Sequence, residues 1–543
     1  MSSNTLIEVF GHILFSFTRG VTEHYNSQEP EYTAESFGYS PLESTGQEWY
    51  RHGDPDEECI YQEYSDRQAT TLDFIRSSRI NAGLMDASIP EENEEAQEDQ
   101  PDEDRAMAWK RLRPSALKTV GRSMYIGTLL SLLTATIIGS VYLLISYLCY
   151  KTINNCELLP KMSIPVNVQW MRSISDAVAC VFLYILFFVY TLFLFRPYQL
   201  TRVKGKLILV ACLAYFLDST YRVVLQALGI SHSKLSTLQK LPLYVLYFMG
   251  VCWQVYLLTK HFRQRWIRRQ QMALFLQMTV PFGSTIILAD VVKCIIYPLY
   301  NKQSTESKLR LVIALFAPLA GVLFKVISRI FVQRLGSITH PGHACVLLAP
   351  LYCLSAIMFR ALQADLDSLK SMAVLGLIHG AAEVIERSAM VVIDHICHVI
   401  WKRTSAPWGS FRTPRRERLM ADIAIMSMLY ESTAIVSVNG VLYLYQYIYL
   451  KDDSFLKLLQ SFAMTTSVQL VIEWFFTSMS LAIETRYQNI AVMAVWQRRW
   501  KRHILMAFVA TISSAIWVSE NFLDMAHERF EEPLNQPCKM PFT

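Results

Sequence analysis

Four acidic side chains lie near the middle of long apolar segments of this sequence: Asp218, Glu383, Glu431 and Glu473. A charge at the depth of a membrane interior costs several kcal/mol unless it has a partner or water. Such residues therefore face the interior of a helical bundle or an aqueous path. Carboxylates placed in this way can exchange a proton or coordinate a small cation, so they predict a transport or conduction path.

Segment 371–400 carries the largest set of polar residues, at spacings of four, four, seven and four: His379, Glu383, Arg387, Asp394 and His398. These spacings place all five near one face of a helix, where Glu383 and Arg387 can pair directly. The face indicates either a polar path or a charge pair that fixes helix packing.

Two further segments repeat the pattern. Segment 458–485 has a polar face of Gln469, Glu473, Thr477, Ser480 and Glu484, and segment 419–449 adds Ser427, Glu431 and Asn439. In segment 207–228, Asp218 and Arg222 are spaced for an i, i+4 pair. Since the four acids fall near the midpoints of their segments, we expect several helices to meet around one polar centre. The expected path comprises Asp218, Arg222, His379, Glu383, Arg387, Glu431, Glu473 and Glu484.

The polar residues of segment 371–400 could instead bind a metal ion or catalyse a reaction. Asp394 and His398 share a helical face and are ligand types that transition metals accept. No second His or Cys group of matching spacing accompanies them, so we expect no metal centre. His379 and Glu383 could serve as acid and base in an intramembrane enzyme, although no nucleophile accompanies them. No Walker loop, G-x-G-x-x-G, G-x-S-x-G or kinase signature occurs, so the sequence favours a protein that is not an enzyme and has no cofactor.

Composition sets the fold class. The chain has 543 residues, of which 52% are hydrophobic and only 18% charged, whereas soluble domains carry about 25% charged residues. Apolar blocks of about 20 residues match about 30 Å of hydrocarbon. The sequence predicts an all-α, polytopic membrane bundle of about eleven spanning helices. The expected spans are 123–149, 177–195, 207–228, 241–259, 272–298, 309–330, 343–362, 371–400, 419–449, 458–485 and 503–520.

Charge is segregated along the chain. Residues 1–104 hold 24 acidic and 5 basic residues, whereas the remainder holds 46 basic and 22 acidic residues. A polar, acidic segment of this kind cannot bury enough apolar surface to order itself. We therefore expect a mostly disordered acidic tail at 1–104, a basic juxtamembrane segment at 105–122, a helical domain at 123–520 and a short tail at 521–543.

Basic residues predict the orientation. Lys and Arg gather before the first span and in the loops after the second, fourth, eighth and tenth, with Arg334 after the sixth. Basic loops stay cytosolic, so we expect a cytosolic N-terminus and an outer or lumenal C-terminus. Anionic lipid headgroups are the expected partners of these loops, and no nucleic acid is expected. Cys156 and Cys538 fall on the same outer side, which leaves a disulfide open.

Two functions are consistent with these features. The first is an ion- or proton-coupled transporter or channel that uses the carboxylates at mid-depth. The second is a membrane receptor or scaffold in which buried charge pairs lock helices together and the acidic tail binds partners. The transported species or ligand, the direction of transport, the organelle and the oligomeric state are left open by the sequence.

Overall fold

The computed structural model describes residues 116–153, 163–195, 197–230, 235–262, 268–302, 307–337, 341–364, 366, 368–402, 414–450, 454–486, 490 and 492–530. The predicted acidic tail at 1–104, most of the basic segment at 105–122, and both Cys156 and Cys538 lie outside these residues. The helical domain expected at 123–520 lies largely within them.

All regular elements of the described residues are helical. The first half contains α5 (Ala116–Leu133), a π-turn (Thr134–Ile138), α6 (Gly139–Ile153), α7 (Val166–Leu194), α8 (Pro197–Leu200), α9 (Lys204–Ala227), α10 (Thr237–Phe262), α11 (Arg268–Val291), a second π-turn (Val292–Ile296) and α12 (Tyr297–Lys302). The second half contains α13 (Ser307–Gln333), a 3₁₀ turn (Arg334–Ser337), α14 (Pro341–Ala344), another 3₁₀ turn (Cys345–Leu347), α15 (Ala349–Ala364), α16 (Leu369–Lys402), α17 (Pro414–Tyr445), a π-turn (Gln446–Leu450), α18 (Phe455–Arg486) and α19 (Val492–Phe530).

Eight helical segments of the described chain are long and apolar enough to cross a membrane. They correspond to eight of the eleven expected spans. The other three, 123–149, 371–400 and 503–520, are helical in the residues that the structure describes but are not among these eight segments. Segment 371–400, which lies in α16, contains several of the charged residues singled out above.

The apolar segments fall into a central and a peripheral set. All of the apolar window of Cys345–Ala364 and 94% of that of Arg418–Ile448 are buried, compared with 17–44% in the other six. The helices α15 and α17 therefore form the centre of the bundle, and they pack along each other. The peripheral helices present large apolar side chains such as Leu209, Leu319 and Val471 outward, as helices that face hydrocarbon do.

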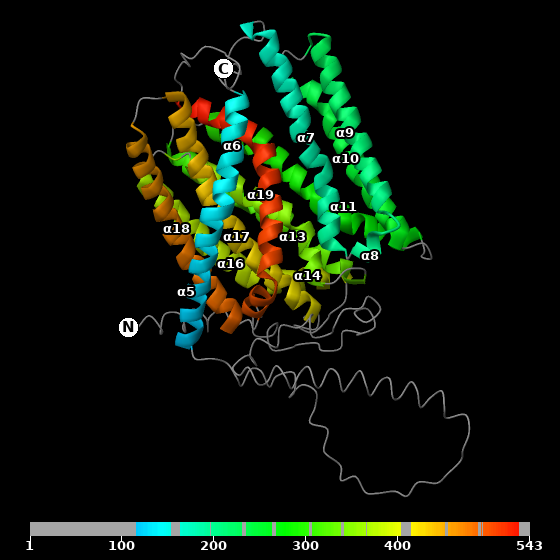
Figure 1. Cartoon of the computed structure of the whole chain (residues 1–543). Helices are drawn as coiled ribbons and strands as arrows, with labels where there is room; N and C mark the ends of the chain where they lie inside the picture. The colour runs from blue at the N-terminus through cyan, green and yellow to red at the C-terminus, as the bar shows by residue number, and fades with distance from the viewer. Residues whose placement is uncertain are drawn as a thin grey trace, which may run out of the picture.

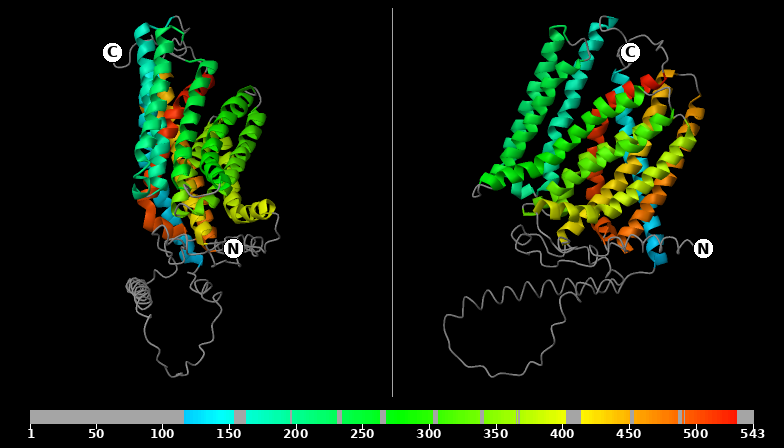
Figure 2. Two further views of the ribbon diagram at one scale, coloured as in Figure 1. Left: turned by 90° about the vertical axis from the view of Figure 1, so that its right-hand side faces the viewer. Right: turned by 180° about the vertical axis from the view of Figure 1, so that it is seen from behind.

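The peripheral helices form two groups on opposite sides of this centre (Figure 1). On one side α7, α9 and α10 stand together, and on the other α5 and α16 pack against α18. The view from behind shows the same division, with α11 and α13 crossing between the groups (Figure 2). Helix α11 contacts α10, α13 and α15, so it connects the two sides.

Helix α7 begins earlier than the sequence predicts. The expected span started at residue 177, whereas α7 starts at Val166 and includes a polar first part. Ser173 donates to Gln226 at 3.2 Å, and Gln226 donates to Gln169 at 3.1 Å. Because these amides and hydroxyls are satisfied by the end of α9, the polar turns of α7 can be buried.

Close approach of α16 and α18 depends on a glycine. A Cβ placed on Gly380 would lie 2.2 Å from the ring of Phe476. Gly380 is one turn from Glu383, and Phe476 is close in sequence to Glu473. The absence of a side chain at Gly380 therefore sets the separation at which these two carboxylates face each other.

We expect Gly380→Ala to destabilise the protein by about 1–3 kcal/mol, because overpacking pushes α16 and α18 apart. The measurement is the midpoint of thermal unfolding in detergent. Gly283→Ala in α11 is the matched control, since its new Cβ would meet no atom within 4 Å. Equal midpoints for the two variants would contradict the role given to Gly380.

Candidate functional site

Three of the four acids singled out in the sequence converge. Glu383 of α16, Glu431 of α17 and Glu473 of α18 each place a carboxylate oxygen within 4.8 Å of the others. We call these residues the carboxylate triad. A separation of this size allows three oxygens to share one ion or one or two protons.

Arg360 supplies the nearest positive charge. It projects from the central helix α15, and its Nε lies 3.0 Å from Glu431 Oε2. Its Nη2 forms a second ion pair with Glu473 Oε2, and its Nη1 donates to Gln363 Oε1 at 3.0 Å. One guanidinium therefore contacts two of the triad's three carboxylates.

Hydroxyl groups complete the polar shell. Ser427 donates to Glu383 Oε1 at 2.9 Å, and Thr477 donates to Glu473 Oε1 at 3.0 Å. Both residues lie one turn from a triad member on the same helix face, as the sequence spacing predicts. Hydrogen bonds of this kind favour an ionised carboxylate over a neutral one.

Arg387 has a different main partner from the one expected. The sequence predicts a pair with Glu383, and the structure has that contact at 3.7 Å. Closer contacts run to Glu484 of α18, whose two oxygens accept from Nε at 2.8 Å and Nη2 at 2.7 Å. This bidentate pair joins α16 to α18 next to the triad.

A second level of ion pairs joins α16 to α13. Lys325 lies 3.7 Å from Glu386, and Arg329 Nη2 lies 2.7 Å from Asp394 Oδ1. Gln333 also donates to Asp394. Both oxygens of Asp394 therefore accept hydrogen bonds from the protein, and the side chain of His398, its proposed partner in a metal site, is outside what the structure describes.

The charges of these two levels do not balance. The described acids are Glu383, Glu386, Asp394, Glu431, Glu473 and Glu484, and the described cations that contact them are Lys325, Arg329, Arg360 and Arg387. If all were ionised, carboxylates would outnumber these cations by two. Glu386 pairs with Lys325, Asp394 with Arg329 and Glu484 with Arg387. The surplus therefore lies at the triad, where Arg360 is the remaining cation of this set.

Access differs among the triad members. The side chains of Glu383 and Glu431 are 15% and 16% exposed, whereas that of Glu473 is 2% exposed. The first two side chains therefore lie at the edge of the packed core, and the third lies within it.

Asp218 is not part of the triad. Its oxygens accept from Arg222 Nε at 2.8 Å and from the hydroxyl of Tyr184 at 3.3 Å. It is buried between α7 and α9, which belong to the other helix group. The similar depth of four acids in their segments thus does not bring all four to one centre, because helix packing also decides which faces meet.

His379 lies one turn from Glu383 but faces α13. Its Nε2 is 3.2 Å from the carbonyl oxygen of Ala314. This contact fixes the ring against a backbone group, and no contact between His379 and Glu383 is among those described.

The sequence interpretation missed three of the four cations. Arg360 is the only charged residue between His343 and Asp365, and this isolation in an apolar stretch is the signal that could have identified it. Arg329 and Lys325 lie in the apolar segment 309–330, and neither belongs to the expected path; Lys325 pairs with Glu386.

Comparison of the chain with protein-family models, with curated proteins and with solved structures finds no match. A function for this chain must therefore be inferred from the geometry of its described residues.

We expect Arg360→Met to destabilise the protein by about 3–5 kcal/mol, because it leaves two buried carboxylates without their guanidinium. The loss should shrink as the pH falls, since protonation removes the unpaired negative charge. The measurement is the unfolding midpoint across a pH series. Adding Glu473→Gln to Arg360→Met should restore part of the stability, and additive effects of the two substitutions would contradict a direct pair.

Proposed function

We propose that the chain is a multi-pass membrane protein that moves a proton or small cation, with the carboxylate triad as its binding site. The observation that carries this proposal is the convergence of Glu383, Glu431 and Glu473 from three helices, with one guanidinium in contact with the last two. Eight helices long and apolar enough to cross a membrane support the setting. Ionisable groups inside such bundles mark ion paths and proton relays.

The surplus of negative charge at the triad is an argument for a bound proton or cation that can leave. Two carboxylates in excess of the neighbouring cations are unfavourable in a low-dielectric interior. A proton or a cation at the triad offsets the surplus, and its departure restores it.

The uneven exposure supports exchange with solvent. Glu383 and Glu431 lie at the edge of the core, where they can receive an ion, while Glu473 and Arg360 lie within it. Oxygen ligands of this kind suit hard cations or protons. The transported species, a channel or carrier mechanism and the direction of movement are not part of the proposal.

The proposed topology keeps eleven spans, with α5 to α6, α16 and α19 added to the eight apolar segments. Basic loops would then contact anionic headgroups on the cytosolic side. The N-terminus would be cytosolic and the C-terminus outer or lumenal.

Glu383→Gln should abolish ion movement while the protein remains folded, because it removes the charge of an accessible triad member and keeps the side-chain shape. The measurement is flux in liposomes that contain the purified full-length protein. A pH-sensitive dye reports protons under an imposed potential, and ion-selective dyes report Na⁺, K⁺ and Ca²⁺.

Asp290→Asn is the matched control, because Asp290 is an exposed acid on α11 far along the chain from the triad. It should leave flux unchanged. Flux of the same rate in Glu383→Gln and wild type would reject the triad as the ion site.

A second candidate function has its own observation in its favour. Each triad carboxylate contacts a cation, Glu431 and Glu473 through Arg360 and Glu383 through Arg387. The cluster could therefore serve only to lock α15–α18 together in a receptor or scaffold, in which the acidic tail binds partners.

A variant that lacks Arg360 and both of its carboxylate partners separates the two functions. The triple change Arg360→Met, Glu431→Gln and Glu473→Gln removes one cation and two anions together. If the cluster only locks helices, the variant should unfold at or above the wild-type midpoint, and Na⁺ or Ca²⁺ should stabilise neither protein. If the triad binds a cation, that ion should raise the midpoint of wild type alone.

A further inference from the structure

The molecule also contains a cavity whose wall includes none of the triad residues. This cavity, of about 900 Å³, lies among α7, α9, α10, α11 and α19, with parts of α13 and α15 in its wall. This volume falls within the range of about 300–1,000 Å³ typical of small-molecule sites. The cavity occupies the region between the α7–α9–α10 group and the central helices.

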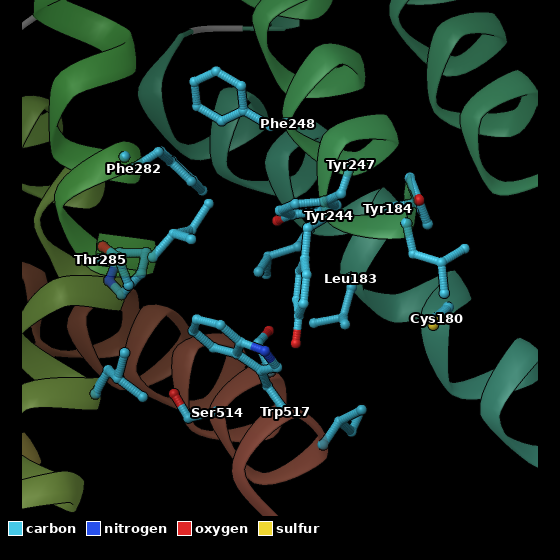
Figure 3. Close-up of a pocket in the computed structure, with 18 of the residues that line it drawn as sticks. Cys180, Leu183, Tyr184, Tyr244, Tyr247, Phe248, Phe282, Thr285, Ser514 and Trp517 are labelled. Carbon is cyan, nitrogen blue, oxygen red and sulfur yellow. The ribbon is translucent and has the colours of Figure 1, made fainter. Parts of the chain in front are cut away.

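The body of the cavity is apolar and aromatic. Figure 3 shows Tyr244 reaching toward Trp517, while Phe282 and Thr285 lie across the cavity from Tyr184 and Cys180. Aromatic walls with few polar groups are the usual lining of sites that bind hydrophobic ligands. The occupant must therefore have a large apolar part.

The cavity extends along most of α7. Its wall includes Arg172 near the start of α7 and Tyr190 near the end of the same helix. These residues are separated by about five turns, or about 27 Å. This length matches an extended hydrocarbon chain, and the apolar and aromatic walls suit one.

Charges gather at one end. Arg172 and Lys240 lie near the starts of α7 and α10, and Arg222 lies near the end of the antiparallel helix α9, so all three are at the same end of the bundle. Asp176 and Asp218 also line the cavity, and both are within 3.9 Å of Arg222. The cavity wall as a whole therefore has one more basic than acidic side chain, which favours an anionic head group.

We propose that this cavity binds a single-chain anionic amphiphile. Its carboxylate or phosphate head lies at Arg172 and Lys240, and its hydrocarbon chain follows α7 toward Tyr190. The cavity is separate from the carboxylate triad, so this binding does not depend on ion movement.

The test uses full-length protein in phosphatidylcholine nanodiscs and three photoreactive probes. Two are anionic, a diazirine-bearing palmitic acid and a diazirine-bearing lysophosphatidic acid, and the third is a neutral diazirine-bearing hexadecanol. At least one anionic probe should label the protein saturably, be displaced by its unlabelled parent, and mark peptides of α10, α11 or α19. Comparing the two anionic probes identifies the head group.

A substitution at a glycine in the cavity wall can fill part of the cavity. Gly283 lines it, and a Cβ there would meet no atom within 4 Å. Gly283→Leu should reduce anionic labelling about tenfold, equivalent to about 1.4 kcal/mol. Gly205→Leu, at an equally open position outside the cavity wall, should leave labelling unchanged. Arg172→Gln combined with Lys240→Gln should weaken labelling by the anionic probes and spare the neutral one.

Three results would overturn the proposal. One is equal labelling of the Gly283→Leu and Gly205→Leu proteins. Another is stronger labelling by the neutral alcohol than by either anion. The third result is obtained with the wild-type protein: all labelled peptides come from outward-facing positions, such as Leu209 and Phe216 of α9.

Discussion

The ion pairs of Arg360 with Glu431 and Glu473 are the interaction on which the rest of the bundle depends. Arg360 belongs to α15, a helix whose apolar window is wholly buried. An isolated guanidinium in such a place is strongly unfavourable. The helices that surround α15 must therefore bring carboxylates to it, which fixes the rotation of both α17 and α18. Packing of α16 on α18 through Gly380 then places Glu383 at the same level.

This arrangement differs from a set of separate salt bridges. Arg329 with Asp394, and Arg387 with Glu484, each have short contacts between one cation and one anion. Such pairs fix the relative position of two helices, and their charges cancel. At the triad, one guanidinium contacts two carboxylates and a third lies nearby, so the local charge can change when a proton or cation arrives. That difference is the physical basis of the proposed ion site.

The other half of the molecule follows a different principle. Around α7, α9 and α10, a few charged groups lie in a wall that is mainly apolar and aromatic. Asp218, Arg222 and Tyr184 form a compact network in that wall. Carboxylates thus have two roles in one chain: in the triad they concentrate negative charge, and beside the cavity they partly offset positive charge.

The sequence by itself determined the helical class, the approximate positions of all eleven helical segments, and the helix faces that carry polar residues. These properties follow from local periodicity and apolar length, which do not require knowledge of neighbours. Glu383, Ser427, Glu431, Glu473 and Thr477 were identified in this way. Only the tertiary structure decided which of those faces meet, because rotation and pairing of helices depend on contacts between distant residues. It separated Asp218 from the other three acids, gave Arg387 its closer partner Glu484, and placed Arg360 at the centre through the burial of α15.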